Sequence, residues 1–220
     1  MSRIDELIRE LCPDGVPYKT LGEIGELVRG NGMPKTDFAE SGVGAIHYGQ
    51  IYTYYGTWAT ETRSYVAPET AAKLAKVDPG DVIITNTSEN LEDVGKAVAW
   101  LGNGQIVTGG HATVLKHSQD AKYIAYWLQT PDFFAQKKKL ANGTKVIDVS
   151  AKALAKVTMP LPPLEVQREI VRVLDLFTTL EAELEAELEA ELEARRRQYA
   201  HYRDSLLTFP EGGGPVGDDG

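Results

Sequence analysis

The C-terminal stretch Pro162–Phe209 limits the possible fold more than any other part of the sequence. It reads as one uninterrupted helix, because it contains no Gly or Pro after Pro163. Pro162 and Pro163 suit a helix start, where the missing N–H costs nothing, and Glu165 and Glu169 suit the positive end of the helix dipole. At 1.5 Å per residue such a helix is roughly 65–70 Å long. The preceding sequence therefore reads as a separate folded part joined to a rod.

Apolar residues follow this rod at the spacing of a helix that packs on another helix. The first steps are four, three, four, three and four residues, and steps of four follow. The predicted dimerisation seam consists of Val166, Ile170, Val173, Phe177, Leu180, Leu184, Leu188 and Leu192. The three-four spacing is typical of paired helices, so a partner helix is expected. The same spacing resumes after the seam, through Tyr199, Tyr202 and Leu206.

The middle of the rod is an internal repeat, LEAELEAELEAELEA, at residues 180–194. Steps of four exceed one helical turn by about 40°, so the leucine stripe drifts around the helix. One interpretation is a strong helix former with a solvated glutamate face. A second is a spacer, because each four-residue unit adds about 6 Å between the parts at its ends. The two interpretations are compatible.

Composition is that of an ordinary globular chain with an extension. The 220 residues are 42% hydrophobic, enough for one domain with a real core. No run approaches about eighteen apolar residues and the N-terminus is charged throughout, so we expect a cytoplasmic protein with neither a membrane span nor a signal peptide. The single cysteine, Cys12, excludes an intrachain disulfide and multi-cysteine zinc sites, and it suits a minor packing role better than that of a nucleophile.

The net charge of −9 at first argues against a nucleic-acid partner, but its distribution changes that conclusion. Of 23 basic and 32 acidic residues, 17 and 18 lie in residues 1–158, leaving 6 and 14 in residues 159–220. The first part is thus nearly neutral and can carry a local basic face. Four lysines, Lys137, Lys138, Lys139 and Lys145, cluster there; they are either a solvated helix end or ligands for phosphates.

The local signals predict an α+β domain, because strands and helices intermix without strict βα alternation. The predicted helices are 2–11, 121–130, 132–140 and a short one capped by Ser150; the predicted strands are 26–29, 82–85, 112–116 and 144–149. A turn of helix is predicted within 19–24, and helix at the end of 64–76. The Gly102-Asn103-Gly104 turn predicts a hairpin of 96–101 with 105–107. The stretch Val43–Thr60 is predicted to form short strands joined by tight turns.

Two stretches offer side chains for binding. Val43–Thr60 is dense in aromatic residues, which either fill a core or form a surface that meets base edges or sugars. Asn86–Asn90 places five polar residues directly after a predicted buried strand, where they are either an ordinary polar loop or a set of hydrogen-bonding groups on a rigid scaffold.

Motifs of catalysis were not found. The sequence lacks the phosphate-binding, dinucleotide-binding, zinc-protease and serine-hydrolase motifs, and it lacks an N-P-P-[YF] methyltransferase motif. His47, His111, His117 and His201 are widely spaced without an identifiable carboxylate partner, so no metal site is expected. The chain is therefore predicted to bind rather than to catalyse.

An ordered set of short blocks resembles the specificity subunit of Type I restriction-modification systems. The blocks are GDVIIT at 80–85, DVGKA at 93–97, GGHATVLK at 109–116, ANGTKVIDVS at 141–150, MPLPPLEVQREIV at 159–171 and RRRQYAHYRDSLL at 195–207. The resemblance covers about residues 15–209. Its most specific part is the L-P-P-L-E-x-Q-R-E-I-V junction into the long helix; each block alone is weak and the ordered set is strong.

The resemblance implies a target recognition domain in residues 1–158, a spacer and dimerisation helix in 159–209, and a tail at 210–220 that is expected to be disordered. In this family the domain reads one half of a bipartite site in double-stranded DNA. The helices dock methyltransferase subunits that use S-adenosylmethionine, so no cofactor is expected on this chain. A motor-nuclease subunit joins for restriction. Full-length members have two recognition domains and two spacers, so this sequence looks like a half-subunit, natural or truncated.

These implications yield specific expectations. A lone amphipathic rod is expected to pair with its own copy, antiparallel about a two-fold axis, giving a homodimer that reads a palindromic bipartite target. The residues expected to contact DNA are His47, Tyr48, Gln50, Tyr52, Tyr54, Asn86, Thr87, Ser88, Glu89, Asn90, Lys96, His111, Lys137, Lys138, Lys139, Thr144 and Lys145. Two other classes stay open: a scaffold or decoy that binds methyltransferase subunits without reading DNA, and an enzyme with an undetected site.

Overall fold

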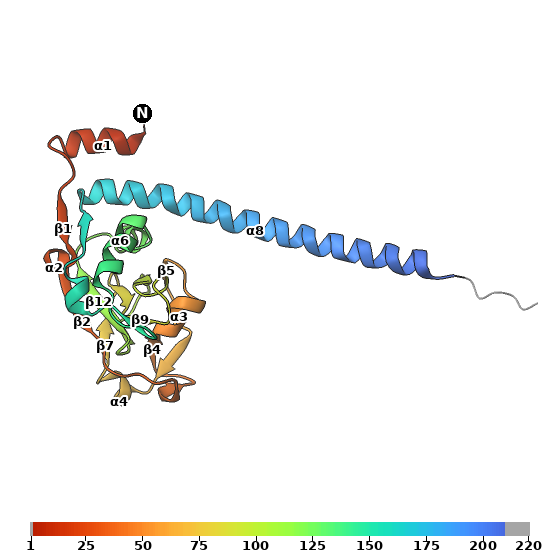
Figure 1. The fold of residues 1–220 in the computed structure, drawn as a ribbon, viewed down its shortest axis with the longest axis horizontal. Helices are drawn as coiled ribbons and strands as arrows, with labels where there is room; N and C mark the ends of the chain where they lie inside the picture. The colour runs from red at the N-terminus through yellow and green to blue at the C-terminus, as the bar shows by residue number, and fades with distance from the viewer. Residues whose placement is uncertain (1, 210–220) are drawn as a thin grey trace, which may run out of the picture. The chain divides into compact units, whose positions relative to one another are not determined.

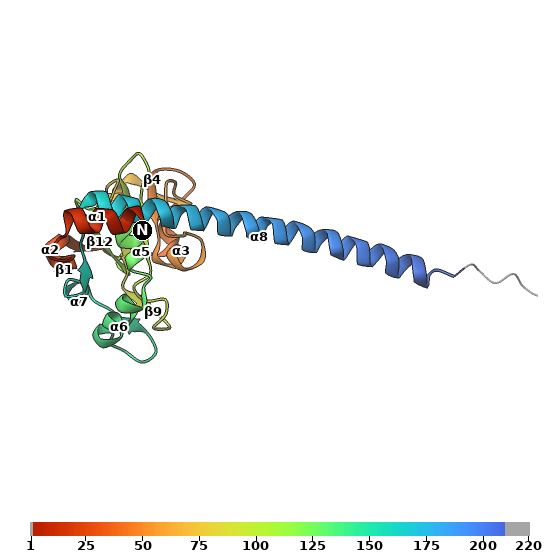
Figure 2. The ribbon, with the colours of Figure 1, turned by 90° about the horizontal axis from the view of Figure 1, so that it is seen from above.

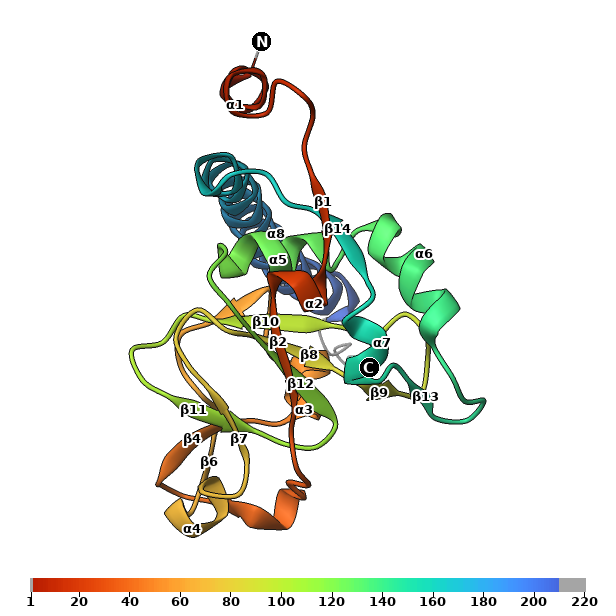
Figure 3. The ribbon, with the colours of Figure 1, turned by 90° about the vertical axis from the view of Figure 1, so that its left-hand side faces the viewer.

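Two five-stranded β-sheets form the centre of the part of the chain that ends at Val171 (Figures 1 and 3). The computed structural model describes residues 2–209, which divide into two units, one continuing to Val171 and the other beginning at Arg172. We call the first unit the head. No helix within residues 2–209 has the length and apolarity needed to cross a membrane.

The first sheet is mainly antiparallel. Its strands, in spatial order, are β2 (Gly25–Arg29), β12 (Ala112–His117), β8 (Val82–Thr85), β10 (Ala97–Trp100) and β5 (Trp58–Ala59). Only the β10–β5 pair at one edge is parallel. Residue Val114 lies opposite Val28 on one side and Ile83 on the other, which places β12 and β8 at the centre of the sheet.

The second sheet lies beside the first (Figure 3). Its strands, in spatial order, are β3 (Phe38–Ala39), β6 (Ser64–Val66), β4 (Val43–Ile46), β11 (Ile106–Thr108) and β7 (Ala75–Val77). Two small antiparallel pairs complete the strands: β1 (Tyr18–Thr20) with β14 (Thr158–Pro160), and β9 (Thr87–Ser88) with β13 (Ile147–Asp148).

The central strands are buried on both faces, because successive side chains of a strand point to opposite sides. In β8, Val82 and Ile84 enter a cluster beneath the helices, whereas Ile83 enters a second cluster with Ile46 and Val77 of the second sheet. A third cluster covers the far side of the second sheet. The head is therefore layered as helices, sheet and sheet.

Short helices lie around the two sheets, and the most N-terminal of them stands apart from both sheets (Figure 3). They are α1 (Arg3–Leu11), α2 (Leu21–Ile24), α3 (Tyr48–Thr53), α4 (Pro68–Ala71), α5 (Ala121–Trp127), α6 (Pro131–Leu140) and α7 (Ala151–Leu154), with a 3-10 turn at Lys35–Asp37. Side-chain caps begin many of them: Ser150 caps α7 and Thr130 caps α6, as the sequence predicted for Ser150. The predicted α+β class is confirmed.

One predicted set of strands is partly wrong. Val43–Ile46 is a strand, but Tyr48–Thr53 is the helix α3 rather than further strands and turns. A local cap outweighs the β preference of the tyrosines: the His47 Nδ1 accepts a hydrogen bond from Gly49 N at 3.1 Å, and the Gln50 side chain accepts one from His47 N at 3.0 Å. The predicted strand at 144–149 is shorter than expected, at Ile147–Asp148. Residues 64–76 contain only one short helix, α4, between two strands.

The predicted hairpin around Gly102–Gly104 is also wrong. Both strands form, but β10 pairs with β8 and β5, whereas β11 pairs with β4 and β7 in the other sheet. The turn is tied to Trp100 instead, whose Nε1 donates to the Gly104 carbonyl at 2.7 Å, and a Cβ on Gly102 would lie 2.2 Å from the Trp100 ring. The turn thus carries the chain from one sheet to the other.

The predicted long helix is confirmed as α8 (Leu164–Leu207) (Figures 1 and 2). The head includes its first two turns, because contacts hold the chain up to Val171 within that unit. There Gln167 is fully buried; its side chain accepts from Asp120 N and donates to Pro162 O at 2.7 Å and to Gln119 Oε1 at 2.9 Å. The expectation for the tail at 210–220 lies outside the described residues.

Candidate functional site

A cluster of contacting rings, here called the ridge, forms where α3 begins and consists of His47, Tyr48, Tyr52 and His111. The Tyr48 ring lies between two imidazoles, with its centroid 4.4 Å from that of His47 and 4.7 Å from that of His111. Tyr52 stands one helical turn further on; its ring is at 83° to that of Tyr48, and the two centroids are 6.1 Å apart. His111 is exposed, whereas His47 is 7% exposed. Aromatic and imidazole groups held in this way can contact bases or sugars without losing much side-chain entropy.

Hydrogen bonds fix the ridge to the loop that follows β8. Thr87 Oγ1 and His111 Nδ1 are 2.9 Å apart, and the Tyr52 hydroxyl donates to the Thr87 carbonyl at 2.5 Å. Burial raises the pKa of Tyr52 to about 12, so its hydroxyl keeps the proton that it donates. Burial, and then Lys35 and His111, lower the pKa of His47, which favours its neutral form.

Close backbone packing positions His111. A Cβ on Gly110 would lie 2.9 Å from the backbone of Asn31, and one on Gly109 would lie 2.6 Å from the Met33 side chain. Gly109 also bridges Asn31 directly. Both glycines are therefore needed for the approach of the two loops, and they place His111 at the tip of the contact.

Two hollows flank the ridge and share Tyr48 and His111. Besides these two residues, the first hollow, of about 380 Å³, is lined by Gly32, Met33, Pro34, Lys35 and His47. The second hollow, of about 400 Å³, is lined besides them by Tyr52, Thr87, Ser88, Glu89, Asn90, Asp93 and Val146. Sequence reasoning missed Lys35 and Val146, which become neighbours of the site only through the tertiary fold.

Several residues expected to contact DNA are instead used within the fold. Asn86 is fully buried; its amide donates to the Val149 carbonyl at 2.8 Å and its Oδ1 accepts from Thr113 Oγ1 at 2.9 Å. Gln50 caps α3 and donates to Ser64 Oγ at 2.7 Å. The expectation of surface contact is therefore wrong for Asn86, and the Gln50 side chain is already engaged.

The lysine cluster does not act as one group. Lys137 is 4% exposed, and its Nζ donates to the carbonyls of Glu92 at 2.9 Å and Val94 at 2.7 Å. Burial lowers its pKa to about 8. The expectation that Lys137 binds phosphate is wrong, because its ammonium is buried and already donates to two carbonyls within the protein. Lys138 and Lys139, in contrast, are exposed on the same helix.

The remaining predicted residues lie on the surface in separate places. Thr144 and Lys145 are exposed just before Val146, on the loop that borders the second hollow. Tyr54 is exposed with the Arg63 guanidinium 4.6 Å above its ring. Lys96 forms an ion pair with Asp93 at 2.7 Å.

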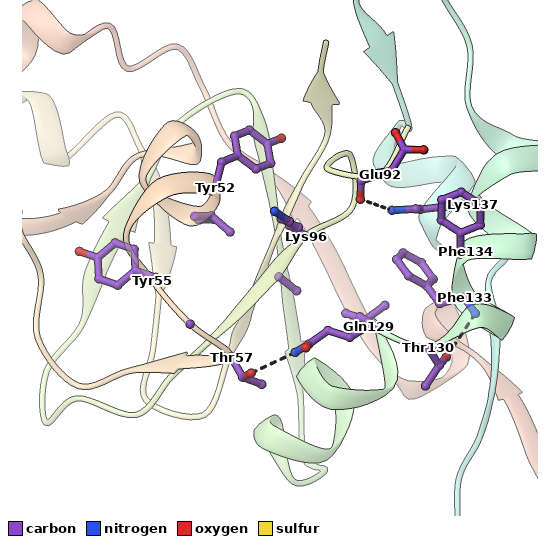
Figure 4. A pocket seen from close by; sticks show the side chains of 14 residues that line it. Tyr52, Tyr55, Thr57, Glu92, Lys96, Gln129, Thr130, Phe133, Phe134 and Lys137 are labelled. Carbon is purple, nitrogen blue, oxygen red and sulfur yellow. Dashed lines mark hydrogen bonds between the residues drawn. The ribbon is translucent and has the colours of Figure 1, made fainter. Parts of the chain in front are cut away.

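Lys96 faces a third hollow, of about 360 Å³, between α3 and the helices α5 and α6 (Figure 4). Aromatic side chains line it, including Tyr52, Tyr55, Phe133 and Phe134. Its polar groups are largely bonded to the protein, as Gln129 is to Thr57 Oγ1 at 3.0 Å. This hollow therefore offers apolar surface and few free polar groups.

The predicted seam on α8 divides into two parts. Val166 is fully buried and Ile170 packs against the core of the head, so the expectation that they join a partner helix is wrong for these positions. Val173 is half-buried. From Phe177 onward the seam is exposed: Phe177, Leu180, Leu184, Leu188 and Leu192 are 50–65% exposed.

Within the described residues, no group of three or more His, Cys, Asp or Glu side chains is arranged to hold a metal ion. The head thus presents a rigid ring-and-loop surface between two hollows, and α8 presents an apolar stripe beyond Phe177.

Comparison with known proteins identifies the family. The model of the Type I restriction modification DNA specificity domain matches residues 13–194, and the chain belongs to this family. It is similar to the specificity subunit of the EcoR124I/EcoR124II type I restriction enzyme of Escherichia coli, with 29% identity over 203 residues, which is 89% of this chain and 49% of that protein. The chain spans about half the length of that relative.

Solved structures share the fold. One from a type I R-M system has a TM-score of 0.60 and 25% identity, over 84% of this chain and 44% of that one. The HsdS subunit from Thermoanaerobacter tengcongensis has a TM-score of 0.58 and 23% identity, over 90% of this chain and 49% of that one. The resemblance predicted from the ordered sequence blocks is confirmed.

Proposed function

We propose that the head reads one half of a bipartite site in double-stranded DNA, as the recognition part of a type I specificity subunit. The observation that carries this proposal is the surface around Tyr48 and His111, in a chain of the DNA specificity domain family. The ridge offers rings and a free imidazole edge, and the adjacent loop offers polar side chains, which suit contact with base edges in the major groove. Exposed lysines at 138, 139 and 145 suit contact with phosphates.

The helix α8 would mediate assembly of the complex. Five large apolar side chains of the seam are at least half exposed from Phe177 to Leu192, and such a stripe is stabilised when a second helix covers it. The simplest partner for the stripe is the same helix of a second copy, packed antiparallel. This arrangement gives two heads related by a two-fold axis and a DNA target of inverted half-sites. The pair would carry methyltransferase subunits, with a motor-nuclease subunit in the restriction complex. Methyl transfer from S-adenosylmethionine would take place on the methyltransferase, so this chain acts without a catalytic site.

Methylome sequencing tests the proposal. Cells expressing the full chain with a type I methyltransferase subunit should show adenine methylation in one bipartite sequence motif, and cells lacking either protein should not. Purified chain should select the same motif from random duplexes. A complex that forms but shows no sequence preference would refute DNA reading and would support the scaffold or decoy function instead.

Removing one repeat unit tests the spacer. Deletion of Leu184–Glu187 shortens the helix by about 6 Å, so the preferred gap between half-sites should shrink by one or two base pairs. The control variant carries Glu185→Gln and Glu187→Gln, which keep the length and change the charge; its gap preference should be that of the wild type. An unchanged gap in the deletion variant would refute the spacer.

A further inference from the structure

We propose that Glu89 is a specificity-determining residue, which accepts a hydrogen bond from the exocyclic amino group of a base, cytosine N4 or adenine N6. This inference rests on the proposed DNA reading by the head and adds the base chemistry that the site selects. It depends on which polar groups around the second hollow are already bonded, and on the one acidic group of this hollow that is not.

Most polar neighbours of Glu89 are engaged within the protein. Thr87 Oγ1 is bonded to His111, and the Ser88 hydroxyl accepts weakly from Asn90 N at 3.5 Å. The Asn90 amide donates to Asp93 Oδ2 at 2.7 Å, and its Oδ1 accepts from Asp93 N at 2.7 Å. Asn90 therefore closes a turn, and little of its hydrogen-bonding capacity remains for a base.

The Asp93 carboxylate is also engaged. Besides its bond to Asn90, it forms an ion pair with Lys96 at 2.7 Å, and these contacts lower its pKa. Among the residues that the structure describes, the Glu89 carboxylate has neither a hydrogen bond nor an ion pair, and its side chain is exposed at the hollow beside Tyr48 and His111. Glu89 is thus the acidic group of this hollow that stays available to a ligand.

The backbone holds Glu89 in place on both sides. Ser88 pairs with Ile147 in the β9–β13 ladder directly before it, and the Asn90 turn follows directly after it. A free side chain on a fixed backbone can act as a reader, because little loop entropy is lost on binding.

The charge of Glu89 sets the kind of base that it can contact. A carboxylate close to DNA is repelled by phosphates, and it only accepts hydrogen bonds. In the major groove, cytosine N4 and adenine N6 are donors, whereas guanine and thymine offer acceptors on their groove edges. Glu89 therefore favours cytosine or adenine at the base it faces and opposes guanine and thymine there. A merely solvated glutamate would weaken binding to every sequence by the same factor.

DNA binding by the full chain carrying Glu89→Gln distinguishes a glutamate that contacts a base from one that is merely solvated. Affinity is measured for the duplex that the wild type selects, for its single-base-pair variants and for a random-sequence duplex. We expect about tenfold weaker binding to the selected duplex, with tighter binding to the random duplex because the repulsion is removed. At one base pair a preference for cytosine should be lost, since an amide both donates and accepts. Where the base is adenine, whose N6 and N7 an amide can bond together, the variant is Glu89→Ala, which should remove the preference.

Glu92→Gln is the matched control, because Glu92 is exposed three residues away and lines the third hollow instead. It removes the same charge and should change binding to selected and random duplexes by one common factor. If Glu89→Gln behaves like this control, or if the lost preference is for guanine or thymine, the assignment is overturned. Wild-type binding without sequence preference would overturn the proposed function itself, whereas a selective wild type and an equally selective variant overturn only the role of Glu89.

Discussion

Lys137 and its two exposed neighbours should respond to mutation in opposite ways, although the three lysines are consecutive. The change Lys137→Met keeps the side-chain stem and removes the ammonium, together with its bonds to the carbonyls of Glu92 and Val94. Each bond from a charged donor contributes about 1.5–3 kcal/mol. The variant also avoids the cost of burying a charge, which is several kcal/mol. Loss of the two bonds costs about 3–6 kcal/mol, and avoiding the buried charge returns about 2–4 kcal/mol of this, so the net loss of stability should be about 2 kcal/mol.

For a unit of this size, a loss of about 2 kcal/mol lowers the melting temperature by about 4–8 °C. The double variant Lys138→Met with Lys139→Met should change stability by no more than about 0.5 kcal/mol, because both side chains are exposed. The measurement is thermal unfolding of each variant followed by circular dichroism.

In a DNA-binding assay, mutation of the exposed lysines should have an effect and mutation of Lys137 should not. If Lys138 and Lys139 each neutralise one phosphate, the double variant should reduce the slope of log affinity against log salt by about 1.8. Lys137→Met, measured where it is fully folded, should leave the slope unchanged. The reasoning is refuted if Lys137→Met keeps the wild-type melting temperature and reduces the salt slope as its neighbours do.

Three further predictions concern buried polar groups. Burial lowers the pKa of Lys137 to about 8 from 10.5, so between these pH values the unfolded chain binds more protons and the free energy of unfolding should rise with pH; urea titrations should show this rise in the wild type and not in Lys137→Met. Asn86→Ala should cost about 2–4 kcal/mol in the same assay, because it leaves a buried carbonyl and the Thr113 hydroxyl unpaired. Gln167→Leu should cost a similar amount, measured as a shift in urea midpoint, because it removes bonds to Pro162 O and to the loop before α5.

Elements with strong local signals could be predicted from the sequence. Ser150 before α7, Pro131 at the start of α6 and Pro163 before α8 each fix a helix start by local chemistry, and the absence of Gly and Pro after Pro163 lets α8 continue. The strand pairing could not be predicted in the same way. The Gly102–Gly104 turn is a local hairpin signal, but the neighbouring strands gain more by joining different sheets, each of which buries them.

The sequence predicted the stretches that form the candidate site but not which of their residues are exposed, because exposure depends on the tertiary fold. The runs at 86–90 and 137–139 are polar throughout, yet each begins with a buried residue, Asn86 or Lys137. For Lys137 a signal was present: it lies four residues after Phe133, on the same face of α6, and that face is buried. For Asn86 the bonds that hold it come from residues far away in the sequence, so no local pattern could reveal them.

The division of the α8 stripe determines how the spacer can be tested. Because Val166 and Ile170 belong to the head, a deletion within 180–194 leaves the packing of the head intact. Deleting four residues shortens the helix by about 6 Å and also rotates everything after it by about 40°. Deleting seven, Ala182–Leu188, shortens it by about 10.5 Å and rotates it by only about 20°. A spacer that acts through length predicts a larger change in gap for the seven-residue deletion, whereas a seam that depends on the direction of Tyr199 and Tyr202 predicts a larger loss of pairing for the four-residue one.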